Sequence, residues 1–337
     1  MNILVVGPSW VGDTVISQSL LMLLRQQHPA AQIDYLAPPW TLPLLARMPE
    51  VRQGIANPFG HGALQFAARR RLGRSLRPAG YDRALVLPNS WKSALVPWFA
   101  GIPRRTGFRG EARRGLLNDL RTLDEQALPQ MVQRFAALAL PAGAPLPDPL
   151  PLPALQSTTS QQLQLLVRLG LDPGQPAVAF CPGAEYGPAK RWPEAHFAAL
   201  ARLLAARGYA VWLVGSPKDH AVAETIAGTS AGTCINLCGK TGIAEAADLL
   251  AAARLVVTND SGLMHVAAAV GRPVIALYGS SSPQFTPPLA ADAHILTLKL
   301  ECSPCFQRTC PLGHFKCLND LAPERVFAAI DFARIGA

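Results

Sequence analysis

Residues 2–14, NILVVGPSWVGDT, decide the fold of the first half of the chain. Asn2 to Val6 is an apolar, β-branched run that ends at Gly7, and leucines and isoleucine recur at helical spacing from Thr14 to His28. This order predicts a buried strand, a tight turn and a helix, which is the opening unit of a parallel α/β sheet. Ligands of open α/β sheets bind outside the carboxyl ends of the strands, so the turn is a candidate site.

Asp13 lies in this turn where a phosphate-binding P-loop has lysine. Residues 7–14 otherwise match that pattern, G-x-x-x-x-G, one further residue and Thr. A carboxylate would repel the terminal phosphates of a nucleoside triphosphate, which argues against that ligand. The local pattern leaves two interpretations of Asp13 open, a functional acid at the strand end and an ordinary helix cap.

The composition predicts a two-domain α/β protein. A chain of 337 residues is longer than one hydrophobic core usually supports. Hydrophobic residues make up 50% of it and charged residues 16%. No apolar run reaches the length of a membrane span, and the sequence begins with a strand in place of a cleavable leader. We therefore expect a cytoplasmic protein.

The net charge of +9 comes from one region. Between Arg69 and Arg121 there are 13 Lys or Arg and three acids, whereas the rest of the chain has 18 bases and 19 acids. A local positive field of this kind suits a polyanionic partner such as nucleic acid, an anionic membrane surface or a phosphorylated substrate. A solubilising surface is the alternative interpretation.

The stretch PAGAPLPDPLPLP, residues 141–153, contains six prolines and predicts a linker. It separates a first domain, 1–150, from a second, 151–337. Buried-type strands alternate with helical stretches in both, which predicts two parallel sheets with right-handed crossovers. The expected strands are 2–6, 32–37, 83–87, 177–181, 210–214, 255–258 and 274–278, and the expected helices include 196–207, 244–252 and a final one from 323 to about 333.

An anion site is predicted in the stretch VVTNDSGLMHVAAAVGRP, residues 256–273. A strand ends at Thr258 and a helix opens near Ser261, so backbone N–H groups and the helix dipole favour a diphosphate. Gly262 permits close approach, and the Asp260 carboxylate is available to sugar hydroxyls. Ordinary capping chemistry is the alternative for this turn, and His265 at this spacing is more often a packing residue.

A second phosphate contact is predicted in PGAEYGPAKRWP, residues 182–193. This loop, shaped by its Gly and Pro residues, follows a strand and is expected to bring Gly183 and Lys190 to a bound diphosphate. Lys190 could neutralise the charge of a departing diphosphate without a metal ion. A solvent-facing basic pair with Arg191 is the alternative. After the next strand, Asp219 in GSPKDH is a candidate to hold an adenosine ribose.

Five stretches in order carry a family resemblance. They are GPSWVGDT (7–14), PNSWKSALVPWFAGIPRRTGFRGE (88–111), PGAEYGPAKRWP (182–193), TNDSGLMHVAAAVGRP (258–273) and YGSSSPQFTPP (278–288). Together they resemble the ADP-heptose:lipopolysaccharide heptosyltransferases, nearest the heptosyltransferase II branch, over almost the whole chain. The resemblance implies the GT-B fold, two Rossmann-like domains facing an interdomain cleft, with acceptor bound by 1–150 and nucleotide sugar by 151–337.

The resemblance also implies residue roles. Asp13 is expected to be the catalytic base and Lys190 to meet the donor phosphates. The D-[ST]-G-L-x-H element is expected to bind the diphosphate and heptose of the donor through Asp260, Ser261, Gly262, Leu263 and His265. Gln284 departs from the family pattern, which has an acid there, and this bears on contacts of that loop and not on the reaction class.

The expected reaction is inverting transfer of heptose from ADP-L-glycero-D-manno-heptose to the first heptose of the lipopolysaccharide inner core. The phosphorylated Kdo-lipid A acceptor is expected at the cytoplasmic face of the inner membrane, with peripheral membrane contact, no nucleic acid and no required cofactor. The candidate acceptor-binding residues come from the basic region and are Lys92, Arg104, Arg105, Arg109 and Arg113. The alternatives are a related GT-B enzyme, heptosyltransferase I-like or using another nucleotide sugar, and a nucleic-acid-binding protein.

Four of the seven cysteines fall in CSPCFQRTCPLGHFKC, at positions 302, 305, 310 and 317. A Cys-x-x-Cys pair followed by further cysteines in a cytoplasmic chain suggests zinc or redox chemistry. The later spacings do not match a standard zinc site, so we expect reduced packing thiols and no metal ligand, with a structural zinc as the alternative.

Overall fold

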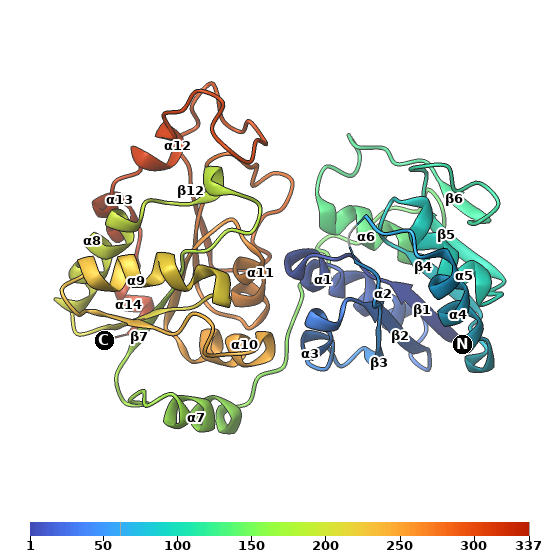
Figure 1. The fold of residues 1–337 in the computed structure, drawn as a ribbon, viewed down its shortest axis with the longest axis horizontal. Coiled ribbons are helices and arrows are strands. Elements are labelled where there is room, and N and C mark those ends of the chain that lie inside the picture. The colour runs from blue at the N-terminus through green and yellow to red at the C-terminus, as the bar shows by residue number, and fades with distance from the viewer. Residues whose placement is uncertain (61, 337) are drawn as a thin grey trace. The chain divides into compact units, whose positions relative to one another are not determined.

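The computed structural model describes residues 1–60 and 62–336. The chain divides into two compact units, Met1–Pro153 and Ala154–Ala337. The division falls inside the proline-rich stretch, three residues beyond the boundary expected from the sequence. Each unit is described by itself (Figure 1).

The first unit contains one six-stranded sheet. Its strands are β1 (Asn2–Val6), β2 (Gln32–Ala37), β3 (Val51–Ala56), β4 (Arg83–Val86), β5 (Arg104–Phe108) and β6 (Asp119–Arg121). Its α-helices are α1 (Val11–Ile16), α2 (Gln18–Gln27), α3 (Leu42–Leu45), α4 (Phe66–Ser75), α5 (Leu95–Phe99) and α6 (Met131–Ala139). The strand order is β3-β2-β1-β4-β5-β6, and all neighbours pair in parallel.

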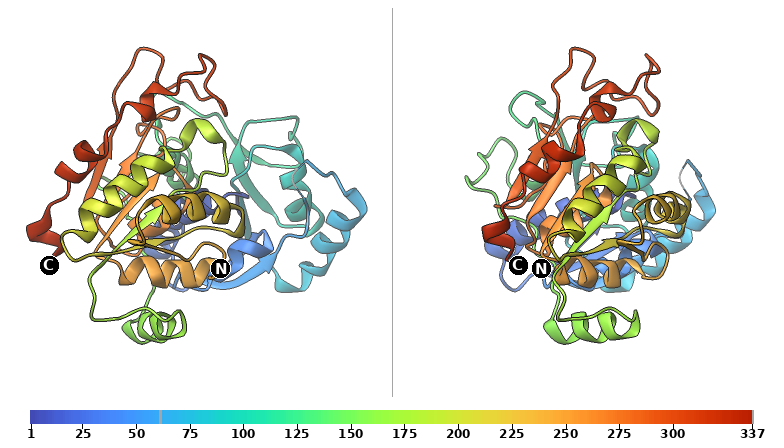
Figure 2. Two further views of the ribbon diagram at one scale, coloured as in Figure 1. Left: turned by 60° about the vertical axis from the view of Figure 1, so that its left-hand side comes forward. Right: turned by 90° about the vertical axis from the view of Figure 1, so that its left-hand side faces the viewer.

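The second unit repeats this plan. Its strands are β7 (Ala177–Cys181), β8 (Ala210–Leu213), β9 (Cys234–Asn236), β10 (Leu255–Asn259), β11 (Val274–Leu277) and β12 (Ala293–Leu296). Its α-helices are α7 (Thr159–Arg168), α8 (Glu194–Ala205), α9 (His220–Thr229), α10 (Ile243–Ala252), α11 (Gly262–Ala269), α12 (Lys316–Asn319), α13 (Pro323–Ala328) and α14 (Phe332–Ile335). The parallel order is β12-β11-β10-β7-β8-β9, and the helices flank the strands (Figure 2).

Both sheets therefore have the Rossmann strand order, which confirms the fold class predicted from the sequence. The order reverses beside the first strand of each unit, between β1 and β4 and between β7 and β10. Crossovers leave in opposite directions at such a point and open a crevice at the carboxyl ends of the two strands. The loops that follow these four strands are therefore the places to look for a site.

Two predicted helices are interrupted. The stretch 14–28 forms two helices because Ser17 ends α1 and precedes α2, and its Oγ donates to the Thr14 carbonyl and lies 2.7 Å from the Tyr35 hydroxyl. The predicted final helix divides into α13 and α14, because the Asp331 side chain accepts from the Arg334 N–H and starts a new helix. Within the described residues, no helix has the length and apolar character needed to cross a bilayer.

Helices α4 and α5 cover one face of the first sheet. Leu4, Val6 and Val86 of the central strands are buried and belong to one apolar cluster with Val96 of α5 and the half-buried Leu72 of α4. In the second unit, the fully buried Trp192 donates from Nε1 to the Leu321 carbonyl, which ties the C-terminal helices to the same core as the sheet.

Gly7 provides a test of the packing behind the first turn. A Cβ added at this residue would lie 2.1 Å from Cε1 of Tyr35, and that ring is fully buried and held through its hydroxyl by Ser17. We expect Gly7→Ala to lower the free energy of unfolding of the first unit by about 1–3 kcal/mol in urea denaturation. Gly60→Ala is the matched control because, in the described part of the chain and apart from its own neighbours in sequence, nothing lies within 4 Å of its added Cβ. Equal stability of the two variants would contradict this packing.

Candidate functional site

Asp13 lies at the carboxyl edge of the first sheet, in the first turn of α1. The N-cap residue of α1 is Trp10, so the simple capping interpretation does not describe Asp13. The carboxylate is half-buried, and its charge, after burial, contributes to the raised pKa of Tyr35. A carboxylate in a first helical turn interacts favourably with the positive end of the helix dipole.

Lys92 and Arg109 lie at the same edge as Asp13. Lys92 belongs to the 3₁₀ helix η3 (Trp91–Ala94) after β4, and its Nζ donates to the Gly62 carbonyl at 2.8 Å. Arg109 follows β5 directly, and its side chain is exposed. Because parallel strands end at a common edge, the structure groups these two cations on the side of the sheet that carries Asp13.

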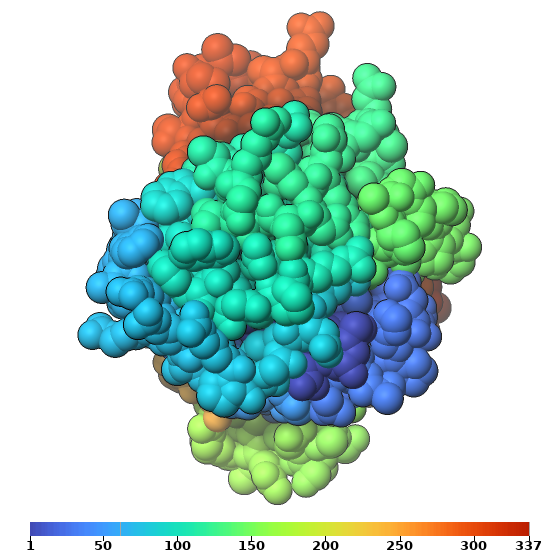
Figure 3. All heavy atoms as spheres, turned by 90° about the vertical axis from the view of Figure 1, so that its right-hand side faces the viewer, coloured from blue at the N-terminus to red at the C-terminus, as the bar shows by residue number. Residues whose placement is uncertain are grey.

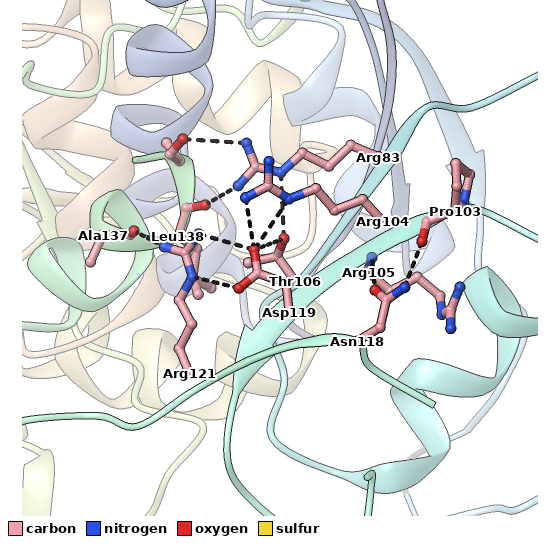
Figure 4. Close-up of polar contacts among 11 residues, drawn as sticks. Arg83, Pro103, Arg104, Arg105, Thr106, Asn118, Asp119, Arg121, Ala137 and Leu138 are labelled. Carbon is pink, nitrogen blue, oxygen red and sulfur yellow. Dashed lines mark hydrogen bonds and ion pairs between the residues drawn. The ribbon is translucent and has the colours of Figure 1, made fainter. Parts of the chain in front are cut away.

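Arg104 and Arg105 lie at the opposite edge, because they begin β5. Arg104 pairs with Asp119 at 3.0 Å, and Arg121 pairs with the same carboxylate at 3.2 Å (Figure 4). Arg105 donates from Nε to the Leu116 carbonyl at 2.6 Å. The structure does not bring these two arginines together with Asp13.

The cluster around Asp119 is balanced within itself. Burial opposes ionisation of the carboxyl, but hydrogen bonds from Arg121, Thr106 and Arg104 lower its pKa to about 2. Burial, followed by the charges of Arg104 and Arg121, lowers the pKa of Arg83 to about 10. These side chains link β4, β5 and β6 to one another.

Arg113 is a structural residue in this unit. Its side chain is 1% exposed and donates to the carbonyls of Phe108 and Pro88 and to the side chain of Asn89. Burial lowers its pKa to about 10. The guanidinium therefore joins the ends of β4 and β5, and its donors are occupied by the protein.

In the second unit, an ion pair joins the loops that follow β7 and β10. Lys190 Nζ lies 2.5 Å from Asp260 Oδ2, with the two side chains 18% and 6% exposed. Asn259 fixes these loops, since it accepts from the Trp192 N–H at 3.0 Å and donates to the Pro182 carbonyl at 2.7 Å. The lysine predicted to contact phosphate thus lies beside the acid predicted to contact sugar.

Helix α11 begins next to this pair. Ser261 is its N-cap residue, and Gly262 and Leu263 form its half-buried first turn. The first N–H groups of a helix have no partner within the helix, so this end can bind an anion. His265, one turn on, is 6% exposed, and its Nδ1 has no hydrogen-bond partner within residues 1–60 and 62–336.

Ser280 and Ser281 complete this edge, and no role for them was predicted from the sequence. They follow β11 and are 1% and 8% exposed, and neither hydroxyl has a hydrogen-bond partner among the residues that the structure describes. Buried hydroxyls without a partner are uncommon and call for an explanation. The two serines lie in the stretch YGSSSPQFTPP, which carries part of the family resemblance, and they belong to a run of small polar residues directly after a buried strand.

Asp219 is engaged by its own loop at the end of η5 (Pro217–Asp219). Its Oδ2 accepts from the Ser216 N–H at 2.9 Å and from the Ser216 hydroxyl at 2.8 Å. A Cβ at Gly183 would lie 2.3 Å from Asp219 Oδ1. Gly183 is therefore required for the close packing of the loops after β7 and β8.

The segment 302–317 packs against the turn that carries Lys190. The Ala189 N–H donates to the Arg308 carbonyl at 3.0 Å, and the Tyr186 hydroxyl donates to the Phe306 carbonyl at 2.7 Å. Four free thiols line one pocket of this segment, namely Cys302, Cys305, Cys310 and Cys317. Over residues 1–60 and 62–336, no group of three or more His, Cys, Asp or Glu side chains is placed to hold a metal ion.

Comparisons with known proteins give the class and the family. The profile described as glycosyltransferase family 9 (heptosyltransferase) matches residues 69–316. Lipopolysaccharide heptosyltransferase 2 of Escherichia coli K12 is 50% identical over 340 residues, covering 98% of each chain. Lipooligosaccharide heptosyltransferase 2 of Haemophilus influenzae is 52% identical over 309 residues, covering 88% of this chain and 89% of the relative.

A solved structure gives the same result. The structure of E. coli ADP-heptose lps heptosyltransferase II superposes with a TM-score of 0.89 at 49% identity, covering 97% of each chain. Fold and relatives together define a glycosyltransferase built from two Rossmann-like units. The chain belongs to glycosyltransferase family 9, the heptosyltransferases. This assignment confirms the resemblance found in the sequence and sets aside the nucleic-acid-binding alternative.

His265 gives this edge a testable pH dependence. Burial, with a smaller contribution from Lys190 and opposed by Asp260, lowers the pKa of His265 from 6.5 to about 4. Between pH 6.5 and 4 the unfolded chain binds a proton that the folded chain does not. The free energy of unfolding should therefore fall as the pH drops through this range, by up to about 1.4 kcal/mol per pH unit, and be constant above it.

In urea denaturation series at pH 7, 6 and 5, His265→Gln should remove the part of the fall in the free energy of unfolding that comes from this histidine. Nuclear magnetic resonance of the imidazole should show a neutral ring across the same range. A midpoint near 6.5 for the His265 ring in the folded protein would show that the burial argument is wrong.

Proposed function

We propose that this chain transfers heptose from ADP-L-glycero-D-manno-heptose to the first heptose of the lipopolysaccharide inner core, with inversion at the anomeric carbon. The relatives named lipopolysaccharide heptosyltransferase 2 support the donor and acceptor classes. The observation that carries the proposal is the Lys190–Asp260 pair beside the start of α11, since it combines a cation, a helix N-terminus and a sugar-binding carboxylate.

In this proposal the donor binds at the carboxyl edge of the second sheet. Lys190 and the first turn of α11 hold the diphosphate, and the Asp260 carboxylate accepts hydroxyls of the heptose. Ser281 lies at the same edge, and its hydroxyl would find a partner in the donor, whereas Ser280 lines the pocket of the four thiols. Asp219 keeps the loop after β8 in place and offers its Oδ1 to the ribose.

The acceptor binds at the carboxyl edge of the first sheet. Lys92 and Arg109 are the cations that lie at this edge with Asp13, so we assign them to the phosphates and acidic Kdo sugars of the inner core. Arg104 and Arg105 are left out of this assignment because they begin β5, at the opposite edge of the sheet. Arg113 is left out because its guanidinium already donates to protein groups.

The proposed chemical step is a single displacement. The acceptor oxygen forms a bond to the anomeric carbon, the bond from that carbon to the diphosphate breaks, and Asp13 takes the hydroxyl proton. An aspartate is a weak base, with an ordinary pKa of about 3.9, so the proton moves late, as the oxygen bonds to carbon. Lys190 and the α11 dipole stabilise the charge that develops on the leaving ADP.

No metal or organic cofactor is required by this proposal, and the thiols of segment 302–317 serve as packing groups. The acceptor is a lipid, so the proposal also places the enzyme at the cytoplasmic face of the inner membrane.

Asp13→Asn tests the base. With ADP-heptose and mono-heptosylated Kdo-lipid A, we expect this variant to bind ADP like the wild type in calorimetry, because the donor edge is unchanged. Turnover should fall by roughly 10²–10⁴-fold, the usual contribution of general base catalysis. Glu125→Gln, which alters a largely exposed acid of the same unit, is the matched control and should keep full activity. Undiminished turnover of Asp13→Asn would remove Asp13 from the mechanism.

A further inference from the structure

The outer side of α4 combines arginines with exposed apolar side chains. Residues 51–81 contain six arginines and no Asp or Glu. The exposed groups on and around α4 form what we call the α4 surface, namely Leu64, Phe66, Arg70, Arg71, Arg74, Arg77 and Trp98. None of these residues is used by the proposed chemistry.

The apolar part of the α4 surface consists of three large side chains, two of which pack on the same ring. Leu64, Phe66 and Trp98 are 41%, 49% and 43% exposed. Phe66 and Trp98 both pack edge-on against Phe99, with ring centroids 5.3 and 4.8 Å apart. Large apolar side chains gathered at one place on a surface indicate an interaction site, whereas scattered ones do not.

The arginines of the α4 surface point to solvent because a different side of α4 packs against α5. A Cβ at Gly73 would lie 2.5 Å from Phe99 Cβ and 2.6 Å from the Val96 carbonyl, so α4 packs closely on α5. The neighbouring side, with Arg70, Arg71 and Arg74, is exposed. In Figure 3 the light-blue atoms of this part of the chain border the blue-green atoms that follow them in sequence.

Buried Arg69 differs from these arginines and connects the α4 surface to the acceptor edge. It donates to the carbonyls of Ala63 and Leu64 and to that of Lys92, and Lys92 in turn donates to Gly62. The loop that presents Leu64 is therefore fixed next to Lys92. A surface bound at α4 would lie beside the edge that carries Asp13.

We propose that the α4 surface docks the enzyme on an anionic lipid bilayer. Guanidinium groups attract acidic headgroups, and aromatic and aliphatic side chains beside them enter the interfacial region, which is the pattern of helices that lie in a membrane surface. The arginines alone would be enough to bind nucleic acid, and such a partner would not explain why Leu64 is exposed. The inference deepens the proposed function, on which it rests for the lipid nature of the acceptor.

Vesicle cosedimentation tests the docking directly. The wild-type protein should bind vesicles of phosphatidylcholine with 30% phosphatidylglycerol and bind pure phosphatidylcholine far less, with affinity that falls as salt rises. The triple variant Arg70→Gln, Arg71→Gln, Arg74→Gln should bind the anionic vesicles roughly 100-fold more weakly. The triple variant Arg202→Gln, Arg254→Gln, Arg325→Gln removes equal charge from the second unit and should bind within about twofold of the wild type.

A second variant tests the apolar part. Phe66→Ala with Trp98→Ala should also lose at least about tenfold in vesicle affinity while keeping all arginines. Binding that is unchanged in both α4 variants would overturn the proposal. Tighter binding of the wild type to duplex DNA than to anionic vesicles would overturn it in favour of nucleic acid.

The transfer assay separates this inference from the proposed function. With acceptor dispersed in detergent, the arginine triple variant of α4 should keep wild-type turnover, because none of these residues belongs to the reaction site. With acceptor embedded in anionic vesicles it should lose activity in step with binding, and equal activity there would contradict docking through α4. A wild-type protein that binds vesicles but transfers no heptose in detergent would refute the function and leave the docking intact.

Discussion

The site of the second unit depends on one ion pair. Lys190 and Asp260 are 70 residues apart in sequence and 2.5 Å apart in space, and both are mostly withdrawn from water. Removing one member of such a pair leaves an uncompensated buried charge, which is costly. A diphosphate is negatively charged, like the Asp260 carboxylate, and can therefore replace it as the partner of Lys190. In the proposed function, donor binding is therefore an exchange of partners at a preformed site, with the carboxylate released toward the sugar.

The Rossmann topology explains why the polar residues divide into two groups. Parallel strands place everything that follows a strand at one edge and everything that precedes it at the other. Asp13, Lys92 and Arg109 follow strands, whereas Arg104 and Arg105 begin one. The excess positive charge of residues 69–121 is therefore divided among different places, which include the links between strands, the carboxyl edge of the sheet and the outside of α4.

Local patterns in the sequence were sufficient to predict the strands β1, β2, β4, β7, β8, β10 and β11, because each is a short apolar run bounded by turn residues. The strands β3, β5, β6, β9 and β12 were not predicted, because they are short or carry exposed and polar residues and depend on pairing with a neighbouring strand. Lys190 and Asp260 were both predicted as donor-binding residues, but their pairing depends on contacts between distant loops. Ser280 and Ser281 were missed because the burial of a hydroxyl is a tertiary property. Arg113 shows the converse, since its charge suggested a ligand contact while the fold turned its guanidinium toward backbone carbonyls.

The affinity for ADP in a double-mutant cycle tests the central claim most directly. Calorimetry should show that Lys190→Met weakens ADP binding by about 10- to 100-fold, the range for a charge-assisted hydrogen bond. In the Asp260→Asn background, Lys190→Met should change ADP affinity by a factor that differs at least about fivefold from its effect in the wild type, because the two side chains interact. Lys218→Met, at an exposed lysine paired with Glu185, should bind ADP within about twofold of the wild type. Unchanged ADP affinity in Lys190→Met, or strictly additive effects in the cycle, would contradict the account.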